Sequence, residues 1–518
     1  MRQSANQIQP DTVPENAHGE KEHDEKRLFI PTAGRAVLVA LAGVTLLVVV
    51  GHWALTVVGY LSSESGRYDF STYYAAAAAL RANLHATIYD PATMARAGAQ
   101  NHTLVNPPLP YTYPPLFAIL LSPFTVLSFR VLSRLWLLTN EALWIVLTFF
   151  FASELRLLLG NVLRRQPQAS AAIAVAGASG SVAAGPMQPQ ASGLRQLLDD
   201  PTPLVALAIA AVVSLGFEPA YQTIMTGQVN FLVLALLAPV PLLSRQRHER
   251  WVGVLLALAT LLKFTPAILI VYLVLRRRWE ALLATLVALA GVSLLCIAVV
   301  GPGVFFAAIP QASQVGAHDA LNNHNEALLA PLGVALGPTA RSSLTFKLVE
   351  YLTLGALALA IGVVLWWAPA RGPVATASMD AQAKRIHNEV EALTYGMALC
   401  AMVLLSPTIW VHHYLWLLPA VFIGLGVTLR RVLETPLIAG VRLRAWGLLA
   451  LITLATLALG WGLPYGWDSD PHPRHTSLFG VTLWPGLLEQ RPLGGLALLM
   501  GLALLLMAYR GRDGRDLA

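Results

Sequence analysis

The chain has 518 residues, of which 56% are hydrophobic and only 12% charged, against roughly 25% charged in an ordinary soluble domain. Lys and Arg number 35 and Asp and Glu 28, giving a net charge of +7. A soluble fold of this size could not hide so much apolar surface, so the composition excludes a soluble enzyme and a disordered chain. The cations lie in short clusters beside apolar runs, which is typical of topology signals and excludes a nucleic-acid partner. The sequence therefore predicts an all-α polytopic membrane protein.

Residues 1–28 are polar and charged and predict a disordered cytoplasmic tail. The apolar runs that follow lie near 36–60, 114–129, 135–152, 203–216, 228–243, 251–275, 281–300, 346–367, 393–408, 414–428, 445–461 and 492–509. Several are shorter than the roughly 20 residues that a straight crossing needs, so 29–510 is predicted to form a membrane domain of about 10–12 helices. Residues 511–518 form a second cytoplasmic tail. Segment 161–200, rich in Ala, Ser, Gly, Gln and Pro, predicts a flexible insert without chemistry.

Alternating crossings place three loops outside the cytoplasm, at 61–113, 301–345 and 462–491. The same alternation puts 153–202 and the cluster Arg245–Arg250 outside, against the positive-inside rule. A re-entrant 251–275 and a non-spanning segment between 114 and 152 remove this conflict with fewer crossings. Both schemes keep the first two loops outside.

The first outer loop contains the most informative stretch, Arg67-Tyr68-Asp69-Phe70-Ser71-Thr72-Tyr73-Tyr74. Asp69 lies a few residues beyond the first apolar run and is expected at the outer membrane surface. With an unperturbed pKa of about 3.9, its carboxylate would be ionised and ready to accept a proton at neutral pH. The alternative, which position alone favours, is that Asp69 caps a helix beginning near Ser71, since Asp is a favoured N-cap residue.

Several short motifs follow one another between about residue 68 and residue 420. They are Tyr68-Asp69-Phe70-Ser71-Thr72-Tyr73-Tyr74-Ala75-Ala76, Ile88-Tyr89-Asp90, Tyr111-Thr112-Tyr113-Pro114-Pro115-Leu116, Gly227-Gln228-Val229-Asn230, Lys263-Phe264-Thr265-Pro266, Arg276-Arg277-Arg278-Trp279, and Ser406-Pro407 through His412-His413-Tyr414-Leu415-Trp416-Leu417-Leu418-Pro419. In this order the chain resembles glycosyltransferase family 87, the polyprenyl-phosphate-mannose-dependent mannosyltransferases of the GT-C superfamily. The chain departs from the family where Phe264 and Thr265 separate Lys263 from Pro266. It departs again where Asn322-Asn323-His324-Asn325-Glu326-Ala327-Leu328 stands in place of an Asn-Gln-Ser-Leu type sequence.

The resemblance implies a GT-C-type transmembrane helix bundle with short helices in its extracytoplasmic loops, in a multi-pass protein of the cell (plasma) membrane. It implies that Asp69 is the general base that deprotonates an acceptor hydroxyl, which displaces lipid phosphate from a hexose, mannose in this family, with inversion. The implied partners are a polyprenyl-phosphate-linked donor, membrane lipids, and a glycolipid, lipoglycan or other acceptor outside the cytoplasm. No cofactor is required and no metal ligands are expected, with a divalent cation left open.

Three further positions have both a catalytic and a structural interpretation. The resemblance makes His324 a second catalytic residue, and an exposed loop histidine is the equal alternative. His412 and His413 lie between two tryptophans and line the site or form an interfacial pair beside an aromatic belt. Lys263 is a charge inside an apolar run and either stabilises the leaving phosphate or pairs with a carboxylate.

Arg67, Tyr73, Tyr113, Gln228 and Asn230 complete the set expected to line the substrate site. For Arg67 the alternative is a cation at the rim, and for Gln228 and Asn230 it is hydrogen bonding between buried helices. The rival function is a transporter or a lipid flippase, whose expected signature is polar or broken helices at the bilayer midplane. Here the polar residues concentrate in the outer loops and at helix ends, which favours the transferase.

Overall fold

The computed structural model describes residues 32–62, 68–83, 85–160, 198–319, 325–337, 339, 342–369, 381–435, 439–460, 476–478, 481–483 and 491–513. The α-helices are α1 (Thr32–Ser62), α2 (Tyr68–Ala82), α3 (Pro91–Gln100), α4 (Leu116–Leu121), α5 (Phe129–Leu159), α8 (Thr202–Leu215), α9 (Glu218–Thr226), α10 (Asn230–Leu237), α11 (Val240–Arg245), α12 (Glu249–Leu262), α13 (Leu269–Leu275), α14 (Trp279–Val300), α15 (Pro302–Asp319), α16 (Ala330–Leu336), α18 (Leu344–Trp367), α19 (Ala381–Leu404), α20 (Leu418–Glu434), α21 (Ala439–Gly460) and α23 (Arg491–Asp513). Three 3-10 helices, η1 (Ser122–Val126), η2 (Thr265–Ile268) and η3 (Val411–Leu417), and an antiparallel hairpin of β1 (Thr476–Leu478) and β2 (Val481–Leu483) complete the described elements.

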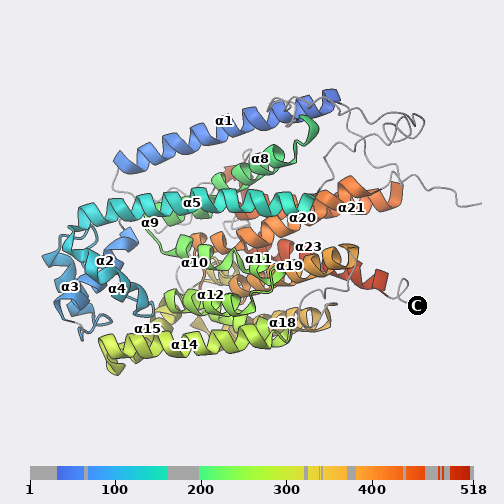
Figure 1. The fold of residues 1–518 in the computed structure, drawn as a ribbon. Helices are drawn as coiled ribbons and strands as arrows, with labels where there is room; N and C mark the ends of the chain where they lie inside the picture. Colours follow the sequence, from blue (N-terminus) through green and yellow to red (C-terminus); the bar gives the residue numbers. More distant parts are fainter. Residues whose placement is uncertain are drawn as a thin grey trace, which may run out of the picture.

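The long helices lie side by side along one axis, and α2, α3 and α4 gather at one end of the bundle (Figure 1). Among the described residues, seven helices are long and apolar enough to cross a membrane, and the bent pair α8–α9 makes an eighth if it counts as one span. The seven are α1, α5, α14, α18, α21, α23 and the continuous η3–α20. These findings confirm an all-α, multi-pass membrane protein.

The crossing expected at 114–129 is wrong as a single helix. It consists of the six-residue α4 and the five-residue η1, which ends at Val126. Pro123 lies in the first turn of η1, where proline lacks the backbone N–H that would continue the ladder of α4. The next long helix, α5, begins at Phe129 with Ser128 as its N-cap.

Helices α12 and α13 form a helical hairpin whose two ends meet. At its open end, Arg278 Nη2 donates to Glu249 Oε1 over 2.6 Å. Nearby, Arg245 at the end of α11 pairs with Glu154 at the end of α5. Twelve alternating crossings would put the arginine clusters at 245–250 and 276–278 on opposite sides of the membrane, so the contact between Glu249 and Arg278 contradicts that scheme. The scheme with a re-entrant 251–275 agrees with this contact.

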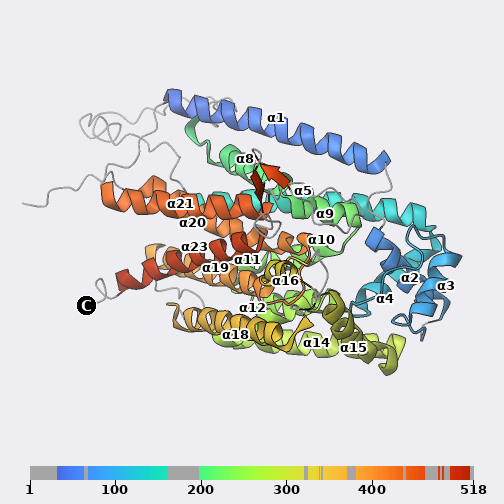
Figure 2. The ribbon, with the colours of Figure 1, turned by 180° about the vertical axis from the view of Figure 1, so that it is seen from behind.

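A close helix contact fixes the position of this hairpin. Gly253 of α12 faces α14, and a Cβ atom there would lie 2.3 Å from the carbonyl oxygen of Ala281. Only glycine permits this approach, so α12 lies directly against α14 along its length. At the far end of α14, the carbonyl of Val300 lies 3.2 Å from Nδ1 of His85, between α2 and α3. Helix α14 therefore joins the open end of the hairpin to the end that carries α2–α4 (Figure 2).

Candidate functional site

Asp69 is the second residue of α2, and Gln228 from a distant segment holds its carboxylate. Gln228 Nε2 donates to Asp69 Oδ2 over 2.7 Å, and the Tyr73 hydroxyl donates to Gln228 Oε1 over 2.7 Å. Asp69 and Tyr73 are four residues apart and so share one face of α2. The Tyr113 hydroxyl makes a longer contact of 3.4 Å with the same Oε1. One amide thus joins three predicted site residues and orients the carboxylate.

The backbone at Gly227 directs Gln228 toward α2. Gly227 ends α9 in the left-handed region, with φ at +78°, a conformation that glycine adopts without strain. Trp136 of α5 donates its Nε1–H to the Gly227 carbonyl over 2.8 Å. The Gln228 side chain is only 4% exposed, so its hydrogen bonds are shielded from water.

Lys263 lies at the tip of the α12–α13 hairpin and is buried against the same site. Its Nζ donates to Asn230 Oδ1 over 3.0 Å and lies 2.7 Å from His413 Nε2. The amine also lies over the rings of Tyr113 and Trp416, 5.4 Å and 5.1 Å from the two ring centres. The sequence motif placed this lysine in an apolar run, and the fold brings it to the polar site at the end of a helix.

The hydrogen bonds of His413 define its tautomer. The Trp410 backbone N–H donates to His413 Nδ1 over 3.2 Å, so in a neutral ring Nε2 carries the hydrogen. When Lys263 is neutral, the lone pair of its amine can accept this hydrogen. His412 contributes its carbonyl, which accepts from Asn230 Nδ2 over 3.2 Å, and its ring packs edge-on against that of His413. Of the two imidazoles, that of His413 contacts the lysine.

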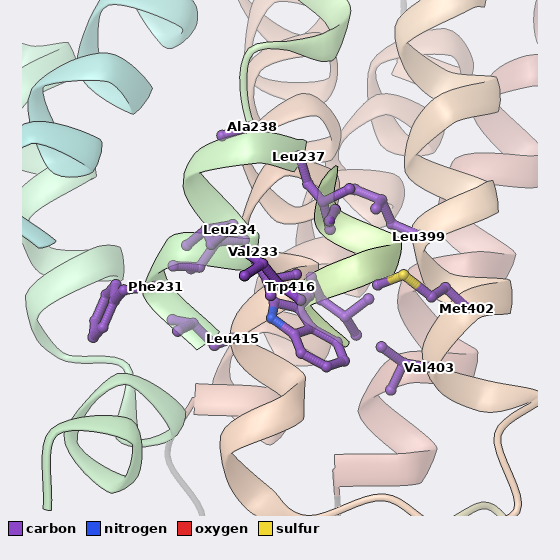
Figure 3. Close-up of a cluster of buried hydrophobic side chains, with 14 of the residues drawn as sticks. Phe231, Val233, Leu234, Leu237, Ala238, Leu399, Met402, Val403, Leu415 and Trp416 are labelled. Atoms are coloured by element: carbon purple, nitrogen blue, oxygen red, sulfur yellow. The ribbon is translucent and has the colours of Figure 1, made fainter. Parts of the chain in front are cut away.

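A hydrophobic cluster around Trp416 packs against the segments that carry Asn230 and His413 (Figure 3). Trp416 of η3 is fully buried among side chains of α10 and α19, including Leu237 and Met402. Its Nε1–H donates to the Asn230 carbonyl over 3.3 Å, so the indole joins the cluster to the site. Rigid packing of this kind holds the polar side chains of η3 and α10 in place.

The carboxylate and the amine are both electrostatically perturbed. Partial burial raises the pKa of Asp69 to about 6, while the hydrogen bond from Gln228 and the charge of Lys263 act in the opposite direction. Burial lowers the pKa of Lys263 to about 7, opposed by the charge of Asp69. The expectation of an unperturbed Asp69 is therefore wrong because the side chain is desolvated. The alternative of an N-cap near Ser71 is also wrong, since the helix begins at Tyr68 and the described hydrogen bond of the carboxylate goes to Gln228.

The structure brings together Asp69, Tyr73, Tyr113, Gln228, Asn230, Lys263, His412 and His413. Arg67 and His324, which were predicted at the same site, lie outside the described residues. Tyr113 contributes through its ring, which packs 5.0 Å from that of Tyr73. Gln228 and Asn230 do make buried hydrogen bonds between segments, as the structural alternative expects. Their partners are the other predicted site residues Asp69, Tyr73, Lys263 and His412.

A buried ion cluster near the site consists of residues that were not among the predicted site residues. Arg491 Nη1 donates to Glu326 Oε1 over 2.6 Å, and its Nη2 pairs with Glu218. Burial raises the pKa of Glu326 to about 7, and Arg491 opposes this rise. The backbone carbonyl of Glu326 accepts the Tyr414 hydroxyl over 2.7 Å, directly beside His413. The available signal was a single arginine at the start of an apolar run that the sequence predicts to begin outside, where the positive-inside rule disfavours a cation.

Within the described ranges, no group of three or more His, Cys, Asp and Glu residues could hold a metal ion. The arrangement instead offers one oriented carboxylate with a pKa near neutrality, which can accept a proton. It also offers a buried amine whose pKa of about 7 lets it be neutral or cationic near neutral pH. Together the two groups suit displacement of an anionic leaving group by a hydroxyl.

Comparison with known proteins identifies relatives of this chain. The sequence model described as Glycosyltransferase family 87 matches residues 111–383, which include Tyr113, Gln228, Asn230 and Lys263. Asp69 and the histidine pair lie outside that match. No solved structure matches the chain.

Curated relatives cover most of the chain. A polyprenol-phosphate-mannose-dependent alpha-(1-2)-phosphatidylinositol mannoside mannosyltransferase of Mycolicibacterium smegmatis is 28% identical over 365 residues, covering 68% of this chain and 71% of the relative. The protein of the same name from Mycobacterium tuberculosis is 28% identical, covering 71% and 77%. A polyprenol-phosphate-mannose-dependent alpha-(1-2)-phosphatidylinositol pentamannoside mannosyltransferase of Mycolicibacterium smegmatis is 26% identical, covering 70% and 71%.

Proposed function

The chain belongs to glycosyltransferase family 87, and from this premise we propose that it transfers mannose from a polyprenol-phosphate-linked donor to an acceptor outside the cytoplasm. That the protein is a membrane glycosyltransferase follows from the family and from its apolar helices. The relatives named above use polyprenol-phosphate-mannose and act on phosphatidylinositol mannosides. A mannosylated inositol lipid is accordingly the first acceptor to test.

In the proposed reaction, Asp69 removes the proton of an acceptor hydroxyl as its oxygen attacks the anomeric carbon of mannose. A bond forms between that oxygen and the anomeric carbon, and the bond from this carbon to the phosphate oxygen breaks. The proton remains on Asp69 and the lipid phosphate leaves with the bonding electron pair. Lys263 takes up a proton from solvent as the anionic donor binds, and its cation stabilises the charge that develops on the phosphate. A single displacement inverts the anomeric centre, so a β-linked donor gives an α-mannoside.

One observation carries this proposal. Gln228 and Asn230 are two residues apart, and their side chains contact Asp69 and Lys263, respectively. Segments far apart in the sequence therefore bring a proton acceptor and a potential cation against the same short segment, 228–230. A base and a phosphate partner are the two groups that a metal-free sugar transfer from a lipid phosphate needs.

The donor can be tested directly with purified protein in lipid vesicles. Polyprenol-phosphate-mannose, polyprenol-phosphate-glucose and GDP-mannose are each supplied with phosphatidylinositol mannoside, and the products are analysed by mass spectrometry and by NMR of the anomeric proton. The proposal predicts an α-linked mannoside from polyprenol-phosphate-mannose and no product from GDP-mannose. Use of GDP-mannose, or a product that retains the β configuration, would contradict it.

A further inference from the structure

A cavity of about 240 Å³ lies at the open end of the α12–α13 hairpin, between α11, α13, α14 and α19. Trp279, the first residue of α14, lines it, whereas the last residue of that helix contacts His85 near α2. A helix of 22 residues is about 33 Å long. Glu249, which lines the cavity, and Lys263 lie at opposite ends of α12, so the cavity is separate from the site of the proposed reaction.

Three side chains that line this cavity have hydrogen-bond donors without a described partner. They are the guanidinium of Arg277, the imidazole of His387 and the amide of Asn388, none of which makes a hydrogen bond or ion pair with another described residue. His387 is only 9% exposed, so its ring is buried against the cavity. Arg277 is exposed and Asn388 is half-buried, so a ligand that enters the cavity and accepts hydrogen bonds can reach their N–H groups.

Two carboxylates that line the cavity have cationic partners, Glu280 with Arg250 and Glu391 with Arg276, so among the described charges that of Arg277 is left without a counter-charge. The other lining arginines are paired, Arg245 with Glu154 and Arg278 with Glu249. Arg277 instead stacks on Trp366, with its guanidinium carbon 4.9 Å from the ring centre. Stacking fixes the plane of the guanidinium and leaves its N–H groups available, which is the arrangement that binds phosphate well.

The neighbouring surface is that of a membrane boundary. Trp279 and Trp367 are 59% and 57% exposed, and such tryptophans mark the level of the lipid headgroups. From there α14 and α18 present exposed apolar side chains, among them Leu283 and Leu359. A ligand with a phosphate in the cavity could thus lay acyl chains along these helices.

We propose that this cavity binds the phosphate headgroup of an anionic phospholipid, with Arg277, His387 and Asn388 as its donors. Basic pockets between transmembrane helices bind acidic headgroups in this way. A free phosphate ion shares the headgroup chemistry but gains nothing from the tryptophans and the apolar helix faces.

Lipid binding to the delipidated, full-length protein tests the proposal by native mass spectrometry and thermal unfolding. Phosphatidylglycerol, phosphatidylcholine and inorganic phosphate are titrated separately. Phosphatidylglycerol is expected to bind and stabilise the wild type more strongly than either of the others. Arg277→Gln should weaken the affinity for phosphatidylglycerol about tenfold or more, because charge-assisted hydrogen bonds are lost. Since Arg277 is exposed, this variant is expected to fold.

Arg156→Gln is the matched control, because it removes one exposed positive charge from the last turn of α5 but does not touch the cavity. Asn388→Asp provides a second test, because it adds a negative charge among the donors. It should also weaken the binding of phosphatidylglycerol. The proposal is overturned if Arg277→Gln and Arg156→Gln bind phosphatidylglycerol equally. It is also overturned if inorganic phosphate or phosphatidylcholine stabilises the wild type as much as phosphatidylglycerol does.

Discussion

Replacing Gln228 with Leu should move the pH dependence of catalysis without removing the base. Gln228 donates the described hydrogen bond to Asp69, and a hydrogen bond to a charged group is worth about 1.5–3 kcal/mol. One pH unit corresponds to about 1.4 kcal/mol, so losing the bond shifts the titration of Asp69 upward by about one to two pH units. In the wild type, kcat/KM should rise with pH through about 6, where Asp69 becomes the carboxylate. In Gln228→Leu the same rise should occur one to two pH units higher.

The assay is the pH profile of kcat/KM for mannosyl transfer, since this ratio reports the free enzyme. Tyr73→Phe is the matched control, because it removes the bond to Gln228 Oε1 and leaves the donor of Asp69 intact. Its profile should stay near that of the wild type. An unchanged profile in Gln228→Leu, or an equal shift in both variants, would refute the role assigned to Gln228.

Three further predictions concern charge and metal. Lys263→Met should lower kcat by about a hundredfold or more, because a preorganised donor to the leaving phosphate is lost. Single-turnover rates at saturating donor measure the chemical step directly, and a wild-type rate there would contradict this role of Lys263. Arg491→Met should reduce the free energy of unfolding by about 3 kcal/mol or more, since it strands Glu326 and Glu218; Arg156→Met, at an exposed site, should have little effect in the same denaturation experiment. EDTA should leave the transfer rate unchanged, and a loss that Mg²⁺ or Mn²⁺ restores would show that the reaction needs a metal.

The membrane class and the composition of the site could be predicted from the sequence. Long apolar runs and a low content of charged residues suffice to predict a membrane protein, because a helix that crosses the bilayer needs both. Motif residues such as Gln228 and Lys263 suffice for the second, since polar side chains inside apolar segments are costly and so are rarely incidental.

The path of the chain could not be predicted in the same way. An apolar run of 25 residues at 251–275 has the length of a crossing, and the contacts of Glu249 with Arg278 and of Arg250 with Glu280 show that it turns back. The pKa of Asp69 was likewise hidden, because desolvation depends on neighbours that the fold supplies. The pairing of Arg491 with Glu326 joins segments 165 residues apart, which no local pattern encodes.

The most direct test of the proposed chemistry is single-turnover transfer from radiolabelled polyprenol-phosphate-mannose by wild type, Asp69→Asn and Asp90→Asn proteins in lipid. Asp90 is the matched carboxylate, because it only caps α3, and Asn is an equally good cap. We expect wild-type and Asp90→Asn proteins to transfer at similar rates, and Asp69→Asn to lose about a hundredfold or more while still binding donor. Transfer by Asp69→Asn at the wild-type rate would show that another group accepts the proton.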